Sequence, residues 1–340
     1  MESNIEKYPE PIKLDTTEDR IETAKQMNSA LSMEQFKASL DAWAAKFTPE
    51  YMEQLSIKCY QDDREYPENF SNWYPHIKDF GKFKTAKIIA NQIFSYEETE
   101  QFRHTDNFSD VNWEALNKIL APTLQKMSKY RIYNIKNGCF SNKFDFQNCL
   151  ATTDNLAQQL WKINYRSAEL ETGGYTELVV REMIPYNDYV IPTIYNGMPL
   201  REELRVFYNM DKHKIEYIED YWKYNYCKVN IGNKSNQIVF DWFHNKLKTR
   251  KTQHRELLKQ LEDRIWDNIH TLVFDGELKG IWSIDFMYVE DEDELYLIDI
   301  ARGFRSAYYN FDKLSEPTKM EIRKEYQDYK KFKEKEIKNG

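Results

Sequence analysis

The amino-acid sequence predicts an α+β protein, and three observations carry this prediction. Segments with helical spacing of apolar residues precede several strand-like segments. An antiparallel hairpin follows late in the chain, at Ile281–Asp299, where apolar residues alternate on both sides of an acidic turn. The sequence contains neither G-x-G-x-x-G nor G-x-x-x-x-G-K-[ST], so a Rossmann or P-loop nucleotide site is disfavoured.

Composition narrows the classes of protein that this chain can represent. Its 340 residues suffice for two domains, and 41% hydrophobic with 15% aromatic content predicts a packed core. The net charge is −8, and a negative overall electrostatic field does not favour nucleic acid, so we do not expect a nucleic-acid partner. The four cysteines form no C-x-x-C pair, so we expect reduced thiols. With no signal peptide and no 18-residue apolar stretch, we expect a soluble, cytoplasmic protein that does not enter membranes.

The N-terminal 65 residues are predicted to lie outside the main fold. Residues 1–30 are polar and weakly patterned, which predicts a mobile tail. Residues 31–65 are predicted to form a helical extension. A capping box at Ser32–Gln35 starts its first helix, and Thr48-Pro49 starts a second one, with Thr as N-cap and Pro at the first helical position. The apolar residues of the first helix are Phe36, Leu40, Trp43 and Phe47.

The next segment, 66–175, is predicted to be an N-terminal α+β subdomain. It contains an aromatic loop, two strands, two helices and a polar turn that ends in lysine. In chain order these are the loop Phe70–Pro75, the strand Thr85–Ile93, a helix capped by Asp110, the strand Arg131–Ile135, the turn Lys136–Lys143 and a helix marked by Leu156, Leu160 and Ile163.

Residues 176–312 are predicted to be a C-terminal α+β subdomain, and 313–340 a charged, solvated helix. The subdomain begins with a buried strand that ends at a proline and continues with a strand pair, a long amphipathic helix and the hairpin. These elements are Glu177–Ile184, Glu203–Tyr208, Lys214–Tyr221, the helix 249–270 with Leu258, Leu261, Ile265 and Ile269 inward, and the hairpin itself.

The hairpin carries one carboxylate inside each of its apolar strands, Asp285 and Asp299. A charge in a strand interior is costly unless something pairs with it. Two such charges on adjacent strands indicate that a cation is held between them.

Strand parity turns this indication into a geometric prediction. Directly opposite residues of an antiparallel ladder point to the same face, so pairing Asp285 with Asp299 puts both carboxylates in one place. That register leaves Glu290–Glu294 as the loop. We therefore predict an odd-length loop, or a bulge, within Met287–Tyr296, with both carboxylates in one cleft beside Lys136.

Charged residues inside other strands extend this set. The small-residue turn 137–141 would present backbone N–H groups to an anion, and Lys136 and Lys143 flank it with positive charge. Cations neutralise phosphate oxygens, and carboxylates hold the Mg²⁺ that bridges them, so the set suits a polyphosphate with Mg²⁺. The alternative is a group of structural ion pairs on a half-exposed sheet, which is the stronger reading for any single residue. The whole set favours a site: Lys136, Arg181, Glu203, Arg205, Asp220, Asp285 and Asp299.

At these residues the sequence resembles the cell-division-cycle protein 123 family, a branch of the ATP-grasp superfamily. The likeness is collinear over about 70–310. It rests on short segments whose joint order is the specific feature: Phe70–Pro75 (FSNWYP), Ile135–Lys143 (IKNGCFSNK), Glu177–Arg181 (ELVVR), Glu203–Phe207 (ELRVF), Asp220-Tyr221, and Asp285 with Leu297–Asp299 (LID).

The resemblance implies an ATP-grasp-like fold, with two α+β subdomains and the nucleotide cleft between them, and it implies ATP and Mg²⁺ as cofactors. Asp285 and Asp299 would be the metal ligands. The implied nucleotide-binding residues are Lys136, Ser141, Lys143, Arg181, Glu182, Glu203, Arg205, Asp220, Asp285 and Asp299. The family's next metal ligand, an Asn, is absent here because Ala301 takes its place, and Arg302 or Arg305 would take over part of the phosphate charge.

The resemblance leaves more than one function class open. Eukaryotic members of the family are chaperones for assembly of translation initiation factor 2, so this chain would be an ATP-binding assembly factor with a translation-factor-like GTPase as partner. The alternative is an ATP-dependent carboxylate–amine ligase that acts through an acyl-phosphate, with Arg302 or Arg305 as catalytic residues that stabilise the developing charge. A third class is a nucleotide-binding scaffold that has lost its chemistry.

Overall fold

The computed structural model describes residues 47–103, 108–184, 191–231 and 237–339. Two compact units are distinguished, Met1–Cys59 and Tyr60–Gly340, and the boundary falls within helix α3 (Pro49–Arg64). This helix begins as predicted, because the N–H of Tyr51 donates to Thr48 Oγ1 at 3.2 Å. The predicted tail 1–30 lies outside the described residues, and so does the first predicted helix up to residue 46. Phe47, the last residue of its apolar pattern, is described and is not helical.

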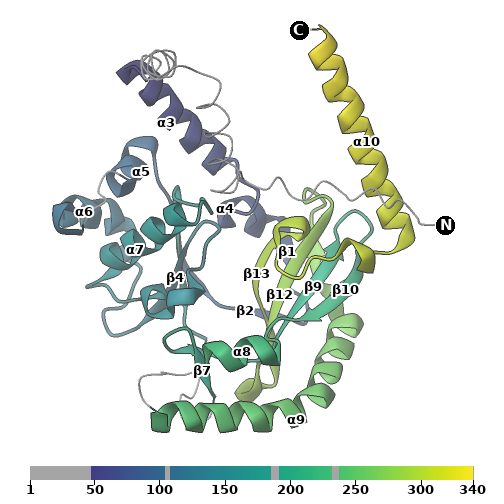
Figure 1. Ribbon diagram of the computed structural model, residues 1–340. Coiled ribbons are helices and arrows are strands. Elements are labelled where there is room, and N and C mark those ends of the chain that lie inside the picture. Colours follow the sequence, from purple (N-terminus) through teal and green to yellow (C-terminus); the bar gives the residue numbers. More distant parts are fainter. Residues whose placement is uncertain (1–46, 104–107, 185–190, 232–236, 340) are drawn as a thin grey trace, which may run out of the picture. The chain divides into compact units, whose positions relative to one another are not determined.

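The second unit is α+β, as predicted (Figure 1). Its first sheet has four strands in the order β3-β6-β4-β5. All neighbouring strands in this sheet are antiparallel. Apolar faces of α6 and α7 join a core with Ile135, Leu178 and Val180 of the sheet. The elements are β3 (Ile88–Ile93), β4 (Tyr133–Asn137), β5 (Leu150–Ala151), β6 (Glu177–Glu182), α5 (Tyr96–Arg103), α6 (Trp113–Leu124) and α7 (Leu156–Glu169).

The second sheet has five strands in the order β10-β9-β12-β13-β2, of which only the β13–β2 pair is parallel. Its core includes Leu261 and Ile265 of the long helix α9, and it also takes in Val179 from the other face of β6. The two sheets therefore share packing through β6. The elements are β2 (Lys84–Thr85), β9 (Glu203–Asn209), β10 (Lys214–Asp220), β12 (Ile281–Val289), β13 (Glu294–Arg302) and α9 (Gln237–Asn268).

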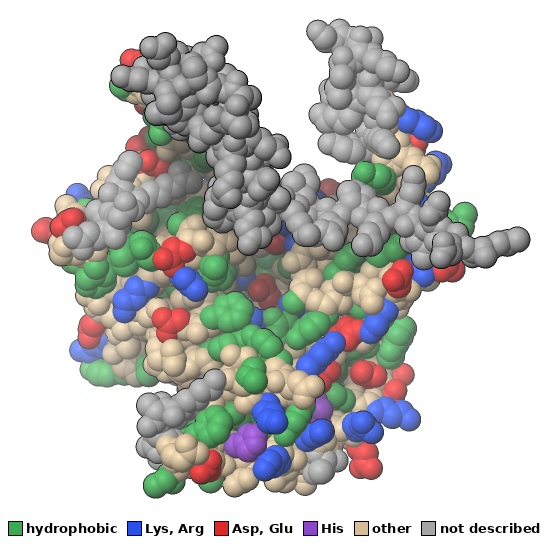
Figure 2. Space-filling model, viewed as in Figure 1, with side chains coloured by type: hydrophobic (Ala, Val, Ile, Leu, Met, Phe, Trp, Pro, Cys, Tyr) green, Lys and Arg blue, Asp and Glu red, His purple; other side chains and the backbone are tan. Residues whose placement is uncertain are grey.

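Smaller elements complete the second unit. These are α4 (Phe70–Trp73), β1 (Ile77–Asp79), β7 (Thr193–Ile194), β8 (Met198–Pro199), α8 (Tyr224–Asn230), β11 (Val273–Phe274), α10 (Glu316–Asn339) and several 3₁₀ turns, among them η3 (Lys143–Cys149), η5 (Glu290–Glu292) and η6 (Gly303–Arg305). On the face shown in Figure 2, basic and acidic side chains are interspersed. Within the described residues, no helix is both long and apolar enough to cross a membrane.

Four local predictions need correction. The helix predicted to be capped by Asp110 is α6, and its N-cap is Asn112, whose side chain accepts from the N–H of Ala115 at 3.1 Å. The aromatic loop predicted at Phe70–Pro75 is helix α4 followed by a 3₁₀ turn, because Phe70 and Trp73 are both buried in the core. The strand predicted at Thr85–Ile93 is divided between β2 and β3, which lie in different sheets. The helix predicted at 249–270 begins earlier, at Gln237.

The predicted hairpin register is confirmed at its centre, since Asp285 pairs with Asp299. The predicted odd-length loop is wrong. Asp293 takes a positive φ of 52° and closes the turn one residue early, which leaves the even-length connection Glu290–Asp293. A one-residue bulge at Ile298 restores the parity, just outside the predicted window.

Sheet membership also differs from the predicted division at 175/176. Strand β6 begins after that boundary, yet it pairs with β3 and β4 of the first sheet. Conversely, β1 and β2 come from the predicted N-terminal part and pair with β11 and β13. The chain therefore crosses between the two halves more than once. At the C-terminal end, α10 forms within the segment predicted as a charged helix.

Candidate functional site

A cavity lies between the two sheets of the second unit, with about 180 Å³ accessible to the centre of a water-sized sphere. One part of its wall is apolar and comes from Ala86, Phe146, Met183, Ile184, Met198, Pro199, Met287 and Ile298. The rest is polar and comes from Asn134, Ser141, Lys143, Arg181, Glu182, Arg201, Glu203, Asp285 and Asp299, with the indole of Trp222 beside them. Seven of the predicted site residues thus line one cavity: Ser141, Lys143, Arg181, Glu182, Glu203, Asp285 and Asp299.

Arg205 and Asp285 form a buried bidentate ion pair at the floor of this site. They are cross-strand partners on β9 and β12, so their side chains leave the sheet on the same face. Arg205 Nε donates to Asp285 Oδ1 and Nη2 donates to Oδ2, both at 2.7 Å. Both side chains are 9% exposed. The guanidinium also donates to the carbonyl oxygen of Ala307 and lies over the ring of Tyr221, 4.5 Å from its centroid.

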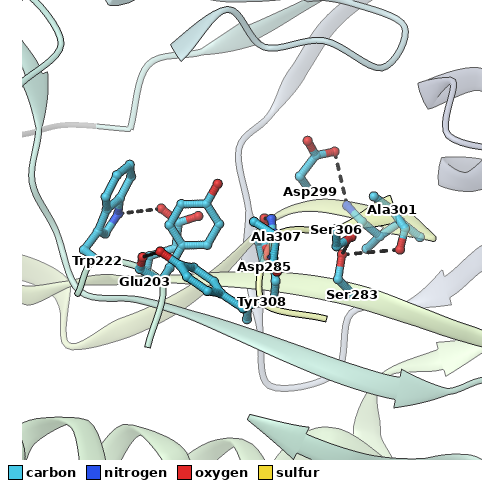
Figure 3. A network of polar contacts seen from close by, with 12 residues as sticks. Glu203, Trp222, Ser283, Asp285, Asp299, Ala301, Ser306, Ala307 and Tyr308 are labelled. Atoms are coloured by element: carbon cyan, nitrogen blue, oxygen red, sulfur yellow. Dashed lines mark hydrogen bonds and ion pairs between the residues drawn. The ribbon is translucent and has the colours of Figure 1, made fainter. Parts of the chain in front are cut away.

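Lys136 and Asp299 form a second ion pair, which joins β4 of the first sheet to β13 of the second. Lys136 Nζ donates to both carboxylate oxygens of Asp299, at 3.0 and 3.1 Å. The lysine side chain is 1% exposed, whereas that of Asp299 is 30% exposed. Figure 3 shows Asp299 with its contact to the ammonium group. The prediction that both carboxylates lie in one cleft beside Lys136 is therefore confirmed.

Arg181 on β6 makes a further connection between the sheets. Its Nη1 donates to the carbonyl oxygen of the bulge residue Ile298 at 2.7 Å, and Nη2 donates to Asn134 Oδ1 at 3.1 Å. Its Nε is buried and has no hydrogen-bond partner within the described part of the chain. Burial lowers the pKa of this arginine from its ordinary value. A buried donor without a partner, on the wall of a cavity, suits an anionic ligand.

Lys143 reaches the cavity from the start of η3. Its Nζ lies 3.8 Å from the ring centroid of Tyr221 and 5.3 Å from that of Trp222. Among the described residues it forms no salt bridge within 4.0 Å. Burial lowers the pKa of the ammonium group, and the nearby carboxylate of Glu203 acts in the opposite direction.

Glu203 on β9 is buried beside this lysine. Trp222 Nε1 donates to its Oε2 at 2.8 Å, as drawn in Figure 3. Burial raises the pKa of the Glu203 carboxyl, and the Lys143 charge only partly offsets that effect. Trp222 was not predicted as a site residue, because a single Trp after a strand gives no signal that separates the site from the core.

Five predicted site residues do not line the cavity. Two of them, Lys136 and Arg205, pair with Asp299 and Asp285 on its wall, and the other three lie elsewhere. Asp220 instead accepts from the backbone N–H of Trp222 and contacts His254. Arg302 and Arg305 are exposed. The backbone N–H of Arg302 donates to the carboxylate of Glu68, and Arg305 donates to the hydroxyl of Tyr66. Arg302 and Arg305 lie away from the cavity because β13 ends at Arg302, where the chain turns into η6.

His254 on α9 was also missed by sequence reasoning, since six scattered histidines show no spacing pattern. Its Nδ1 lies 2.8 Å from Glu202 Oε2, and its Nε2 lies 3.1 Å from Asp220 Oδ2. Burial by itself would lower the pKa of His254, but the hydrogen bonds to Asp220 and Glu202 outweigh it and raise the pKa to about 9. The imidazolium therefore joins α9 to the edge of the second sheet.

This arrangement predicts a pH-dependent contribution to stability. The folded-state pKa of His254 is raised above its ordinary 6.5, so the stabilisation is complete below about 6.5 and is lost as pH rises through about 9. The difference in free energy of unfolding between the wild type and His254→Gln is expected to be largest near pH 6 and to shrink by pH 10. Urea denaturation at several pH values measures it, with the exposed His270→Gln as control. A difference that does not vary with pH would contradict the prediction.

The donor set of the cavity fits a divalent cation only in part. Carboxylate oxygens are suitable Mg²⁺ ligands, and Asp285 and Asp299 both line the cavity. Their four oxygens all accept from Arg205 or Lys136. In the described ranges no group of three or more His, Cys, Asp or Glu side chains is placed to hold a metal ion. The remaining ligands would have to come from a bound molecule or water.

Comparisons with known proteins return structural likeness alone. No protein-family model matches the chain, and no curated protein matches it by sequence. C-terminally truncated Cdc123 from Schizosaccharomyces pombe is similar with a TM-score of 0.40 and 13% identity, covering 72% of this chain and 86% of that chain. Cdc123 from the same organism is similar with a TM-score of 0.38 and 14% identity, covering 72% and 85%.

Both solved structures bear the name of the family whose motifs the sequence resembles. At these TM-scores and identities, the likeness assigns no ligand, partner or residue role to this chain.

Proposed function

We propose that this chain binds ATP together with Mg²⁺ in the cavity between its two sheets. The observation that carries the proposal is the division of the cavity wall into an apolar part and a part with cations and carboxylates from both sheets. Ligand sites of this kind combine apolar lining with a few convergent polar groups. The strand-interior charges that the sequence singled out supply most of those groups.

The residues have distinct proposed roles. Lys143 and Arg181 would bind phosphate oxygens, because each is a buried or half-buried cation on the cavity wall. Met183, Met198 and Met287 would contact the adenine ring, since thioether side chains adapt to flat aromatic surfaces. Bound Mg²⁺ would neutralise charge between phosphate oxygens. Of the two predicted ligands, Asp299 would bind it directly, while Asp285 stays paired with Arg205 beside it.

We further propose that the bound nucleotide serves an assembly factor of the cell-division-cycle 123 type, whose partner is a translation-factor-like GTPase. The ligase alternative names Arg302 and Arg305 as its catalytic residues, and neither of them lines the cavity. Group transfer is therefore left without the two residues that this alternative assigns to it. Release of ADP or phosphate from ATP in the presence of a carboxylate and an amine acceptor would support the ligase instead.

Nucleotide binding is tested by thermal denaturation. Adding ATP and Mg²⁺ is expected to raise the melting temperature, because a ligand that binds only the folded state stabilises it, by about 2.7 kcal/mol at a hundredfold excess over Kd. Mg²⁺ with tripolyphosphate is the control for the contribution of the adenine base. It is expected to raise the melting temperature less than ATP does, because it makes no contact with the apolar part of the cavity wall. A melting temperature that stays flat up to millimolar ATP would refute the proposed function.

A further inference from the structure

We infer that Lys136 and Arg205 keep two of the cavity's carboxylates, Asp299 and Asp285, from holding a divalent cation until nucleotide is present. This inference rests on the proposed function and concerns the order in which the site is assembled. Lys136 is the decisive residue, because its partner Asp299 is the more exposed of the two carboxylates.

The first observation is that the carboxylates are already neutralised. Asp285 accepts two hydrogen bonds of 2.7 Å from Arg205, one on each oxygen. Asp299 accepts from Lys136 on both oxygens, at 3.0 and 3.1 Å. A metal ion that approached either carboxylate would meet a cation within hydrogen-bond distance of the same oxygens, and like charges at that separation repel strongly in a partly buried site.

The second observation is a shortage of ligands. Mg²⁺ takes six oxygen ligands in octahedral geometry and gives up its water reluctantly. Four carboxylates lie on the cavity wall, those of Glu182, Glu203, Asp285 and Asp299, but no three metal-ligating side chains of the described residues are placed to hold one ion. A polyphosphate supplies the missing ligands, since its oxygens bind metal ions. The same oxygens compete with Asp299 for the ammonium group of Lys136.

Metal and nucleotide are therefore expected to bind cooperatively. Nucleotide draws Lys136 from Asp299 and frees a carboxylate for the metal, and by reciprocity the metal strengthens nucleotide binding by the same factor. Arg205 is held more firmly by its bidentate geometry, and its partner Asp285 is less exposed than Asp299, so Asp285 stays paired when Asp299 is released.

Removing the lysine is the direct test. Lys136→Met leaves Asp299 without its cation, and this variant is expected to bind Mn²⁺ in the absence of nucleotide at least about tenfold more tightly than the wild type. Binding is measured from the electron paramagnetic resonance signal of free Mn²⁺. Lys84→Met is the matched control, because Lys84 likewise forms ion pairs with carboxylates, Glu292 and Glu294, but it is exposed and does not line the cavity. This control is expected to bind Mn²⁺ as the wild type does.

Adding Asp299→Asn to Lys136→Met is expected to abolish the gain. Equal Mn²⁺ affinity of Lys136→Met and the wild type would overturn the inference, as would an equal gain in Lys84→Met. Should Lys136→Met fail to fold, Lys136→Gln replaces it. The wild type provides a second test, because tight binding of Mn²⁺ by the wild type in the absence of nucleotide would contradict the inference. A flat response to ATP would refute the proposed function alone, because none of these Mn²⁺ titrations contains nucleotide.

Discussion

Replacing Arg205 with methionine is expected to destabilise the folded chain by about 3–5 kcal/mol. The substitution leaves Asp285 in a buried strand without the two hydrogen bonds that now satisfy both of its oxygens. An uncompensated buried charge is among the most costly defects in a protein interior. Urea denaturation, monitored by far-UV circular dichroism, measures the change in free energy of unfolding.

Two controls separate this effect from the loss of any surface arginine. Arg166→Met removes an exposed pair with Glu169, at 2.7 Å, and is expected to cost at most about 1 kcal/mol. Combining Arg205→Met with Asp285→Leu removes both charges and is expected to recover part of the stability. If Arg205→Met costs no more than Arg166→Met, the pair is not the buried unit described above.

Replacing Lys143 with methionine is expected to weaken ATP binding by about tenfold to a hundredfold, which corresponds to the 1.5–3 kcal/mol of a hydrogen bond to a charged group. Stability is expected to stay the same or to rise, because the buried ammonium group forms no salt bridge within the described residues and methionine keeps the apolar stem. Isothermal titration calorimetry measures the affinity, and denaturant titration measures the stability.

The exposed Lys248→Met is the matched control for this variant, with the same change of charge on α9. Its affinity for ATP is expected to equal that of the wild type. Equal affinities of the two variants would exclude Lys143 from the phosphate site. A loss of stability in Lys143→Met would show instead that the lysine is needed by the fold.

The parts of the site that local sequence rules govern could be predicted. Alternation along a strand placed Glu203 and Arg205 on one face, and parity placed Asp285 opposite Asp299. These rules depend only on the two-residue period of a strand. For an even-length connection, which the structure shows, the same rules call for a bulge, and Ile298 is that bulge.

The parts that depend on tertiary packing could not be predicted. His254 meets Glu202 and Asp220 because α9 crosses the edge of the second sheet, and no sequence spacing records that crossing. Arg302 is predicted at the site because the resemblance leaves a metal ligand absent at Ala301, but the chain turns into η6 directly after Arg302. β2 joins β13 through a parallel pairing between residues about 210 apart, which pattern reasoning does not reach.

The same limit explains the predicted division of the chain. A boundary at 175/176 follows the order of motifs in the sequence, whereas β6 pairs with strands on the other side of that boundary. Long-range strand pairing decides sheet membership, and it is set by which apolar faces meet in the core. Val179 and its neighbour Val180 face the two different cores, so β6 can serve both halves.

A structure of this chain with a non-hydrolysable ATP analogue and Mg²⁺ tests the central claim most directly. The proposal predicts the triphosphate beside Lys143 and Arg181, the adenine ring against Met183 and Met198, and the metal ion on Asp299 with Lys136 displaced toward phosphate. A cavity that stays empty at saturating analogue, or an analogue bound elsewhere on the chain, would contradict it.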